Sequence, residues 1–270
     1  MNTISDLVSP DLRTVLRALK LGQMLATLPD RLTLARQQKM THADFLELVL
    51  ADEHSRREAK SASLRARAAG LDPGMRLDTW DDTAAVTYDR QLWNELTSLR
   101  FLDGPHGALI LGPVGVGKTH LACTLGHIAI RRRRTVLMAS TAKLFKRLRA
   151  ARLDNTLEPE MRRLAGIDLL ILDDFALTPL DPTETADFYQ LCVERHRKAS
   201  TIVTSNRTPE EWLAMMADPL LAQSAVDRLA STAHELIVEG PSYRQRQKPS
   251  IHHANGKPVD QNKENHHDHS

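Results

Sequence analysis

The chain has 270 residues, 41% of them hydrophobic, which is enough for one large domain or for a core domain with a smaller appendage. Lysine and arginine (36) nearly balance aspartate and glutamate (34), so the formal charge of +2 excludes a strongly basic or strongly acidic protein. The sequence has no run of about 18 apolar residues and no basic-then-apolar start, so we expect a cytoplasmic protein without a membrane span. Cys123 and Cys192 lie in apolar helical patterns, as expected of buried free thiols in a reducing compartment.

Residues 1–70 are predicted to form a separate, all-helical module. Ser9 and Pro10 are typical of a helix start, and apolar residues recur at helical spacing until Pro29, which should end the run. A short second helix follows. Thr41 has an acidic residue three positions later, which resembles a capping box and predicts the start of a third, long helix that ends near residue 70.

The second half of this third helix is polar and basic. A solvent-exposed charged face is the simpler interpretation, and a surface for nucleic acid or a partner protein is the alternative. The basic residues concerned are His54, Arg56, Arg57, Lys60, Arg65 and Arg67.

Residues 71–100 contain a proline, a glycine and an acidic patch around Trp80, which predict a linker that leads into a helix over 89–99. The main domain is expected to cover 101–251. The tail, 252–270, is polar and contains five histidines without the spacing of a metal site, so disorder is expected there.

Strand and helix patterns alternate through the main domain, with helices expected over 121–130 and 183–197 among others. Such alternation predicts an α/β fold whose parallel sheet has helices on both faces. Ligands then bind at the carboxyl ends of the strands. The expected strands are 108–111, 135–139, 168–173, 201–205 and 234–238.

The stretch between the first expected strand and its following helix fits the phosphate-loop pattern, with two glycines four residues apart before Lys118 and Thr119. Glycines allow backbone N–H groups to turn towards phosphate oxygens, and the helix N-terminus favours negative charge. Lys118 can reach the β and γ phosphates of ATP, and the Thr119 hydroxyl can ligate Mg²⁺. The predicted nucleotide-binding residues are Gly112, Pro113, Val114, Gly115, Val116, Gly117, Lys118, Thr119 and His120.

Polar side chains at the ends of two further strands complete a predicted ATP-hydrolysing site. Asp173 ends an apolar strand and would hold Mg²⁺ together with Thr119, and Asp174 would orient or deprotonate the attacking water. Asn206, after the next strand, can bond the water or a γ-phosphate oxygen. Arg228 could neutralise transition-state charge in a neighbouring subunit or form a surface pair with Asp227, and the sequence does not separate these alternatives.

Nine basic residues and no acidic residue lie between Arg131 and Arg152. A solvated face usually mixes signs, so the run favours a phosphate-binding patch for duplex DNA, and the absence of aromatic residues favours contact with the backbone. The predicted nucleic-acid contacts are Arg131, Arg132, Arg133, Arg134, Lys143, Lys146, Arg147 and Arg149.

The order of these motifs, followed by Thr204-Ser205-Asn206-Arg207, Asp227-Arg228-Leu229 and Gly240-Pro241-Ser242-Tyr243-Arg244, resembles the IstB-type transposition helpers. These are AAA+ ATPases close to the helicase loader DnaC, and the resemblance covers roughly 10–250. It implies an AAA+ domain in which Asn206 is a sensor, Arg228 an arginine finger and Arg244 a second sensor. It also implies that the helix with Lys143 to Arg149 faces DNA.

One position departs from that family pattern. AAA+ proteins commonly have an Asp-Glu pair where this chain has Asp173-Asp174. Asp174 is one methylene shorter than glutamate, so we expect slow hydrolysis that suits a regulatory switch.

The sequence therefore predicts an ATP-dependent, DNA-binding helper that oligomerises on duplex DNA, with ATP at subunit interfaces, and recruits or activates an IstA-type transposase. One alternative is a DnaC-like helicase loader whose residues 1–70 bind a helicase. Another alternative is a phosphate-loop kinase. The sequence shows no apparent lid that would bind a phosphate acceptor, which argues against this alternative.

Overall fold

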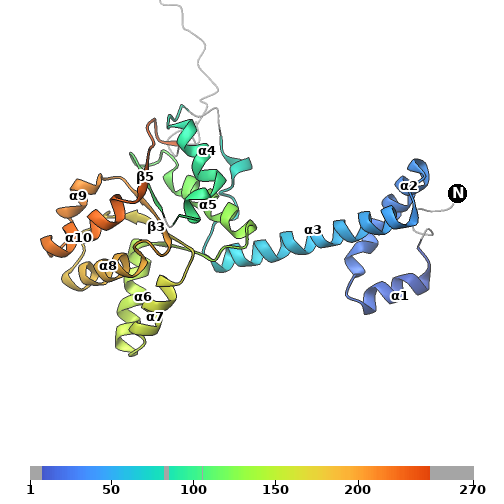
Figure 1. Cartoon of the computed structure of the whole chain (residues 1–270), viewed down its shortest axis with the longest axis horizontal. Helices are drawn as coiled ribbons and strands as arrows, with labels where there is room; N and C mark the ends of the chain where they lie inside the picture. Colours follow the sequence, from blue (N-terminus) through green and yellow to red (C-terminus); the bar gives the residue numbers. More distant parts are fainter. Residues whose placement is uncertain (1–7, 82–84, 105, 244–270) are drawn as a thin grey trace, which may run out of the picture.

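The computed structural model describes residues 8–81, 85–104 and 106–243. A sheet with helices on both faces forms the body, and the long helix α3 leaves this body and carries α1 and α2 at its far end (Figure 1). The α-helices are α1 (Pro10–Ala18), α2 (Leu28–Gln38), α3 (His42–Ala68), α4 (Arg90–Ser98), α5 (Lys118–Arg131), α6 (Thr141–Leu153), α7 (Leu157–Ala165), α8 (Pro182–Arg195), α9 (Pro209–Leu213) and α10 (Pro219–Ala230). The strands are β1 (Gly107–Leu111), β2 (Val136–Ser140), β3 (Leu169–Phe175), β4 (Ser200–Ser205) and β5 (Ala233–Ile237). Short 3₁₀ turns are η2 (Gly22–Ala26), η3 (Leu77–Thr79) and η4 (Arg100–Leu102).

The five strands form one parallel sheet in the order β2-β3-β4-β1-β5. Each strand starts within one residue of its expected start, and the predicted α/β class with a parallel sheet and a helical N-terminal region is confirmed. In this order β1 and β3 flank β4. The carboxyl ends of β1, β3 and β4, where the sequence placed the chemistry, therefore lie side by side.

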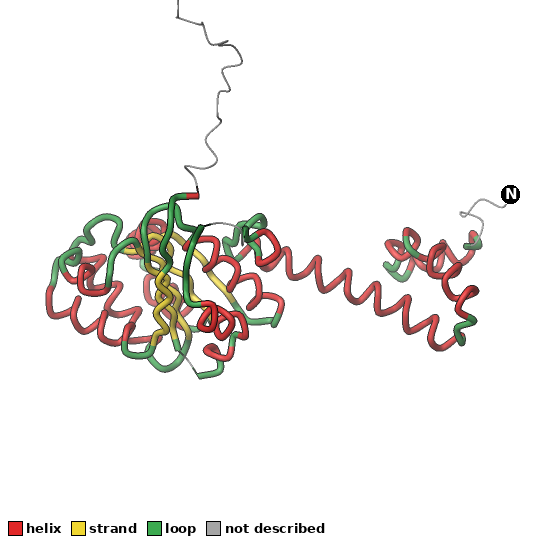
Figure 2. The backbone as a smooth tube through the Cα atoms, turned by 90° about the horizontal axis from the view of Figure 1, so that it is seen from above, coloured by secondary structure: helices red, strands yellow, loops and turns green. Residues whose placement is uncertain are grey.

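Alternating residues of the strands supply two separate cores, one on each face of the sheet. Ala108 and Ile110 of β1 pack with Leu121 of α5 on one face. Leu109 points to the other face and belongs to the core that includes Phe188 of α8. Figure 2 shows helices on both sides of the strands. Both faces are covered, which explains why β1 and the first four residues of β3 form nearly continuous apolar runs.

The helices α1 and α3 start at the expected caps, but α2 starts earlier than expected, at Leu28 rather than after Asp30. The Ser9 hydroxyl accepts a hydrogen bond from the Leu12 amide, and the Thr41 hydroxyl caps α3. Pro29 does not end the first helical run; it lies in the first turn of α2, where its missing N–H costs no helical hydrogen bond. The first helix has already ended at Ala18.

A buried carboxylate holds α3 against the end of α1. Glu53 is only 5% exposed and accepts hydrogen bonds from Arg56 (2.7 Å) and Arg57 (2.6 Å). Arg57 also donates to the Lys20 carbonyl oxygen at 2.7 Å. The Arg56 hydrogen bond is the main cause that lowers the pKa of Glu53 to about 2. Part of the basic face of α3 therefore stabilises the helical module itself.

None of the helices in the described ranges is both long enough and apolar enough to cross a membrane.

Replacing Glu53 with glutamine should lower the free energy of unfolding near neutral pH by about 1 kcal/mol, because charge-assisted hydrogen bonds to two half-exposed arginines are lost. The folded-state pKa lies below the usual 4.5, so this stabilisation is present above pH 4.5 and disappears as the pH falls towards 2. Urea unfolding of wild type and Glu53→Gln between about pH 2 and pH 7 measures the difference in their free energies of unfolding. Glu47→Gln, an exposed change on the same helix, is the control, and a difference that persists at the lowest pH would contradict the assignment.

Candidate nucleotide site

The phosphate-loop segment has the backbone conformation that its glycines were expected to supply. Gly112, Gly115 and Gly117 have φ values of 149°, 86° and 101°, which other residues rarely adopt. A Cβ atom on Gly112 would lie 2.0 Å from the Val238 carbonyl oxygen. The loop therefore passes directly against the end of β5, and a side chain at this position would displace it.

Lys118, the first residue of α5, is 6% exposed and its ammonium lies inside the loop. Its Nζ donates to the carbonyl oxygens of Gly112 (2.8 Å) and Pro113 (2.7 Å). It also donates to Oδ1 of Asn206 at 2.5 Å. The structure thus brings the lysine of the loop and the amide that follows β4 into direct contact, although 88 positions separate them in the sequence.

A hydroxyl–carboxylate pair lies at the start of α5. Thr119 Oγ1 donates to Asp173 Oδ1 at 2.9 Å, and Thr204 Oγ1, from β4, donates to the same oxygen at 2.6 Å. Asp173 is 9% exposed. Hydroxyl and carboxylate oxygens are typical ligands of Mg²⁺ when phosphates supply its other ligands. The donor set at Thr119 and Asp173 therefore fits the predicted Mg²⁺.

A β-bulge separates the roles of the two adjacent aspartates. In the pairing of β3 with β4, the register shifts between Leu172 and Phe175, and Asp174 has a left-handed φ of 54°. Leu172 and Phe175 consequently face the same core, which a regular strand would not allow at this spacing. Asp173 faces α5 through Thr119, and Asp174 is exposed and lines the cavity next to the loop.

A cavity of about 520 Å³ lies over the phosphate loop and is large enough for a nucleotide. The predicted residues Val114 to His120, Asp174 and Asn206 line it. Its remaining wall comes from residues that were not predicted to form the site: Gly74, Met75, Thr79, Trp80, Asp81, Val86, Leu177 and Tyr243.

Trp80 is the largest of these additional residues. A Cβ atom on Gly117 would lie 2.7 Å from its ring, and the ring meets His120 edge-on with 5.2 Å between centroids. The His120 ring nitrogen Nε2 donates to the Arg76 carbonyl oxygen at 2.9 Å. The segment that was expected to be a linker thus forms a side wall of the cavity. An isolated tryptophan within an acidic patch was its only sequence signal.

Tyr243 closes another side of the cavity. Its backbone N–H donates to the Gly115 carbonyl oxygen at 2.9 Å, so the end of the described chain lies on the phosphate loop. Arg244, the expected second sensor, lies outside the described residues.

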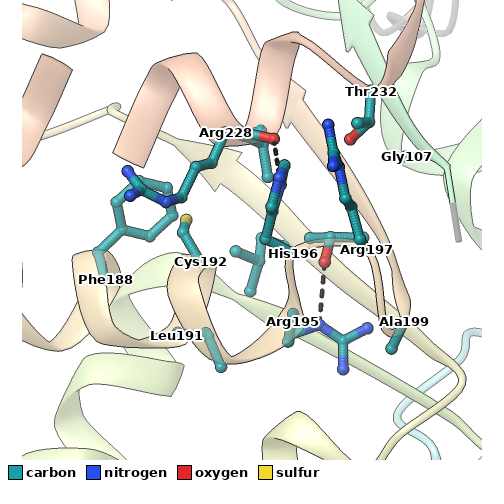
Figure 3. Close-up of a pocket in the computed structure, with 13 residues that line it drawn as sticks. Gly107, Phe188, Leu191, Cys192, Arg195, His196, Arg197, Ala199, Arg228 and Thr232 are labelled. Atoms are coloured by element: carbon teal, nitrogen blue, oxygen red, sulfur yellow. Dashed lines mark hydrogen bonds between the residues drawn. The ribbon is translucent and has the colours of Figure 1, made fainter. Parts of the chain in front are cut away.

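Arg228 lies in a different place. Its Nη1 donates to the Ser224 carbonyl oxygen at 2.8 Å, and its guanidinium lies 5.8 Å from the Tyr189 ring centroid. It lines a small cavity between α8 and α10, where its own carbonyl oxygen meets the His196 ring (Figure 3). That cavity includes Gly107, the first residue of β1, and it shares no lining residue with the nucleotide cavity. Arg228 therefore does not belong to the site of its own chain.

The predicted nucleic-acid residues fall into two groups rather than one patch. Residues 131–134 comprise the last residue of α5 and the turn that leads into β2. Lys143 to Arg149 lie on α6, which follows the other end of β2. Half of them pair with acids elsewhere in the chain: Arg133 with Glu58, Arg134 with Asp103, Arg147 with Glu160 and Arg149 with Asp181. Arg131, Lys143 and Lys146 make no ion pair within the described ranges. The assignment to DNA stays a prediction for a surface that is less positive than the run suggests.

Solved structures share the fold of the body. The DnaC helicase loader superposes with a TM-score of 0.50 and 20% identity over 62% of this chain and 98% of its own. DnaI gives a TM-score of 0.51 and 19% identity over 61% of this chain and 90% of its own. At this identity the likeness establishes an AAA+ fold and leaves function to other evidence.

Sequence comparison identifies the family. The model of the IstB-like ATP binding proteins matches residues 14–250. An ATP-binding protein of an insertion sequence in Mycobacterium tuberculosis is 35% identical over 90% of this chain and 98% of its own length. An ATP-binding protein of insertion sequence IS21 from Pseudomonas aeruginosa is 32% identical over 88% of this chain and 90% of its own. The chain therefore belongs to the family of IstB-like ATP binding proteins, and it is an ATPase with the AAA+ fold.

Proposed function

We propose that this ATPase is a transposition helper that assembles on duplex DNA when it binds ATP and recruits or activates an IstA-type transposase. The observation that carries the proposal is that Lys118, Thr119 and Asn206 line one cavity, with Lys118 bonded to Asn206 and Thr119 bonded to Asp173 behind it. The names of its relatives associate them with ATP and with insertion sequences. The expected cytoplasmic location stays a prediction.

The residues of the cavity suit the hydrolysis of a γ-phosphate. Lys118 and Asn206, which are hydrogen-bonded to each other, would both bind phosphate oxygens of ATP. Thr119 and Asp173 would hold Mg²⁺, which neutralises charge on the phosphates when it is bound. Asp174 is exposed to the cavity and would orient the attacking water. Its short side chain and the bulge that carries it support slow, regulatory turnover.

The position of Arg228 supports an oligomer. A cation that stabilises the transition state must lie beside the γ-phosphate, and Arg228 lines a cavity that is separate from that of its own chain. If Arg228 is an arginine finger, it therefore acts on the ATP of a neighbouring subunit.

A helicase loader is the alternative, and its support is the likeness of the fold to DnaC. The two functions differ in the partner of residues 1–70. Affinity capture with the full chain, carried out separately with a transposase and with a replicative helicase, distinguishes them.

The change Lys118→Ala should abolish ATP-dependent assembly on DNA, because it removes the only cation that lines the cavity within the described residues. Sedimentation of the protein with duplex DNA, with and without ATP, measures assembly. Lys198→Ala, which alters an exposed lysine paired with Glu194, is the control. Equal assembly by wild type and Lys118→Ala would contradict the dependence of DNA assembly on ATP binding.

The change Arg228→Ala should leave ATP affinity within about twofold of wild type and lower kcat by roughly 10³, the usual effect of losing an arginine finger. A mixing experiment tests the action between subunits. Arg228→Ala and Asp174→Asn chains, each inactive alone, should regain part of the ATPase activity together, since some interfaces then combine an intact Asp174 with an intact Arg228. Loss of ATP binding in Arg228→Ala, or no recovery on mixing, would contradict a role across the interface.

The change Trp80→Ala should weaken ATP binding roughly tenfold, because a large aromatic wall of the cavity is removed. Trp80→Phe preserves a ring and should stay close to wild type. Titration calorimetry with a non-hydrolysable ATP analogue measures both. An unchanged Kd in Trp80→Ala would show that the nucleotide does not use this wall.

A further inference from the structure

A second large cavity, of about 780 Å³, lies where α3 leaves the body beside α5. Its walls come from three parts of the chain: the last three turns of α3, the C-terminal half of α5 and the segment that follows α3. Figure 1 shows α3 departing from the body in this region. We call this cavity the α3–α5 groove.

Three arginines from these three parts line the groove. Arg67 belongs to α3, Arg131 to α5 and Arg76 to the connecting segment. All three are exposed, and none forms an ion pair within the described ranges. No carboxylate of the described residues therefore offsets the charge of these three guanidinium groups by a direct contact.

The acids near the groove are already engaged. Glu58, which lines it, pairs with Arg133 at 2.9 Å, and the Asp72 carboxylate accepts a hydrogen bond from the Gly74 amide at 2.8 Å. His127 also lines the groove, and its Nε2 donates to the Asp72 carbonyl oxygen. Asp72 keeps its negative charge, and Glu58 is paired with Arg133, so the three arginines still leave the groove with an excess of positive charge.

The remaining lining is small and aliphatic. Ala59, Ala62 and Ala66 lie on one side of α3, and Ile130 lies opposite them on α5. Among the described residues no Phe, Tyr or Trp lines the groove, and the His127 ring is only 9% exposed, so no large aromatic face is open to a base. Guanidinium groups bind phosphate oxygens in pairs of hydrogen bonds. These features together favour a phosphodiester backbone over an exposed base.

We propose that the α3–α5 groove is a binding site for the phosphodiester backbone of DNA, in which Arg67 and Arg76 contact phosphates together with Arg131. This inference rests on the proposed function, because it assumes that the chain binds DNA. It assigns Arg67 and Arg76, which lie outside the basic run on α5 and α6, to that contact. It also places DNA next to the nucleotide, since Pro73 and Arg76 line the groove and the intervening Gly74 and Met75 line the nucleotide cavity.

The test measures binding of the full chain to a duplex of about 30 base pairs by fluorescence anisotropy. A non-hydrolysable ATP analogue is present, and the salt concentration is varied between about 0.05 and 0.2 M. Arg67→Ala and Arg76→Ala should each reduce the log–log salt slope by about 0.9. That change corresponds to roughly eightfold weaker binding at about 0.1 M salt. Arg162→Ala, an exposed arginine on α7, is the matched control and should leave the slope unchanged.

The outcomes separate the inference from the function on which it rests. If wild type binds DNA and both variants keep its slope, the groove is not a DNA site and the proposed function survives. If wild type itself does not bind DNA, the proposed function fails and the inference with it. Polyglutamate of matched charge serves as competitor. Displacement of DNA by polyglutamate at equal charge concentration would overturn the assignment to phosphodiesters and indicate an acidic protein segment instead. Unchanged ATP affinity and circular dichroism in both variants exclude misfolding.

Discussion

The hydrogen bond from the Thr119 hydroxyl to the Asp173 carboxylate joins α5, the helix that follows β1, to β3, a strand that does not pair with β1. β4 lies between β1 and β3, and it contributes Thr204 to the same carboxylate. The site therefore depends on the register of three strands, in which Ile110 lies opposite Thr204. A slip of β4 by one residue would turn Thr204 to the opposite face and leave the buried carboxylate without one of its donors.

The sequence was informative where the pattern is local. The phosphate loop, the strand ends and the helix caps each depend on a few neighbouring residues, so their positions followed from residue type and spacing. Asp173 and Asn206 could be placed at one sheet edge because parallel strands end together. The bulge at Asp174 could not be predicted, because it results from pairing with β4. Trp80 was missed for a similar reason: it reaches Gly117 only after the chain has folded back over α5.

The basic run shows the opposite limitation. Its residues have one sign in the sequence, but Arg133 and Arg149 meet acids from distant segments in the structure. A charge run thus measures local composition and does not measure the field at the surface. Such a scan found Arg67 and Arg131 in two separate basic stretches, but it missed Arg76 and could not show that the three arginines line one groove. Unpaired charges that converge from different elements are better evidence for a polyanion site than a longer run whose members are already paired.

The residues that follow α3 anchor the end of this helix to the body, next to the segment that lines the nucleotide cavity. The Met138 amide donates to the Ala69 carbonyl oxygen at 2.7 Å, and a Cβ atom on Gly70 would lie 2.6 Å from the Met138 carbonyl oxygen. The chain then continues through the segment 73–80, which contributes residues to the α3–α5 groove and to the nucleotide cavity. A change in that segment on nucleotide binding would be transmitted to a helix anchored at its base, and a 27-residue helix spans about 40 Å. A small local rotation would thus move α1 and α2 by a much larger distance.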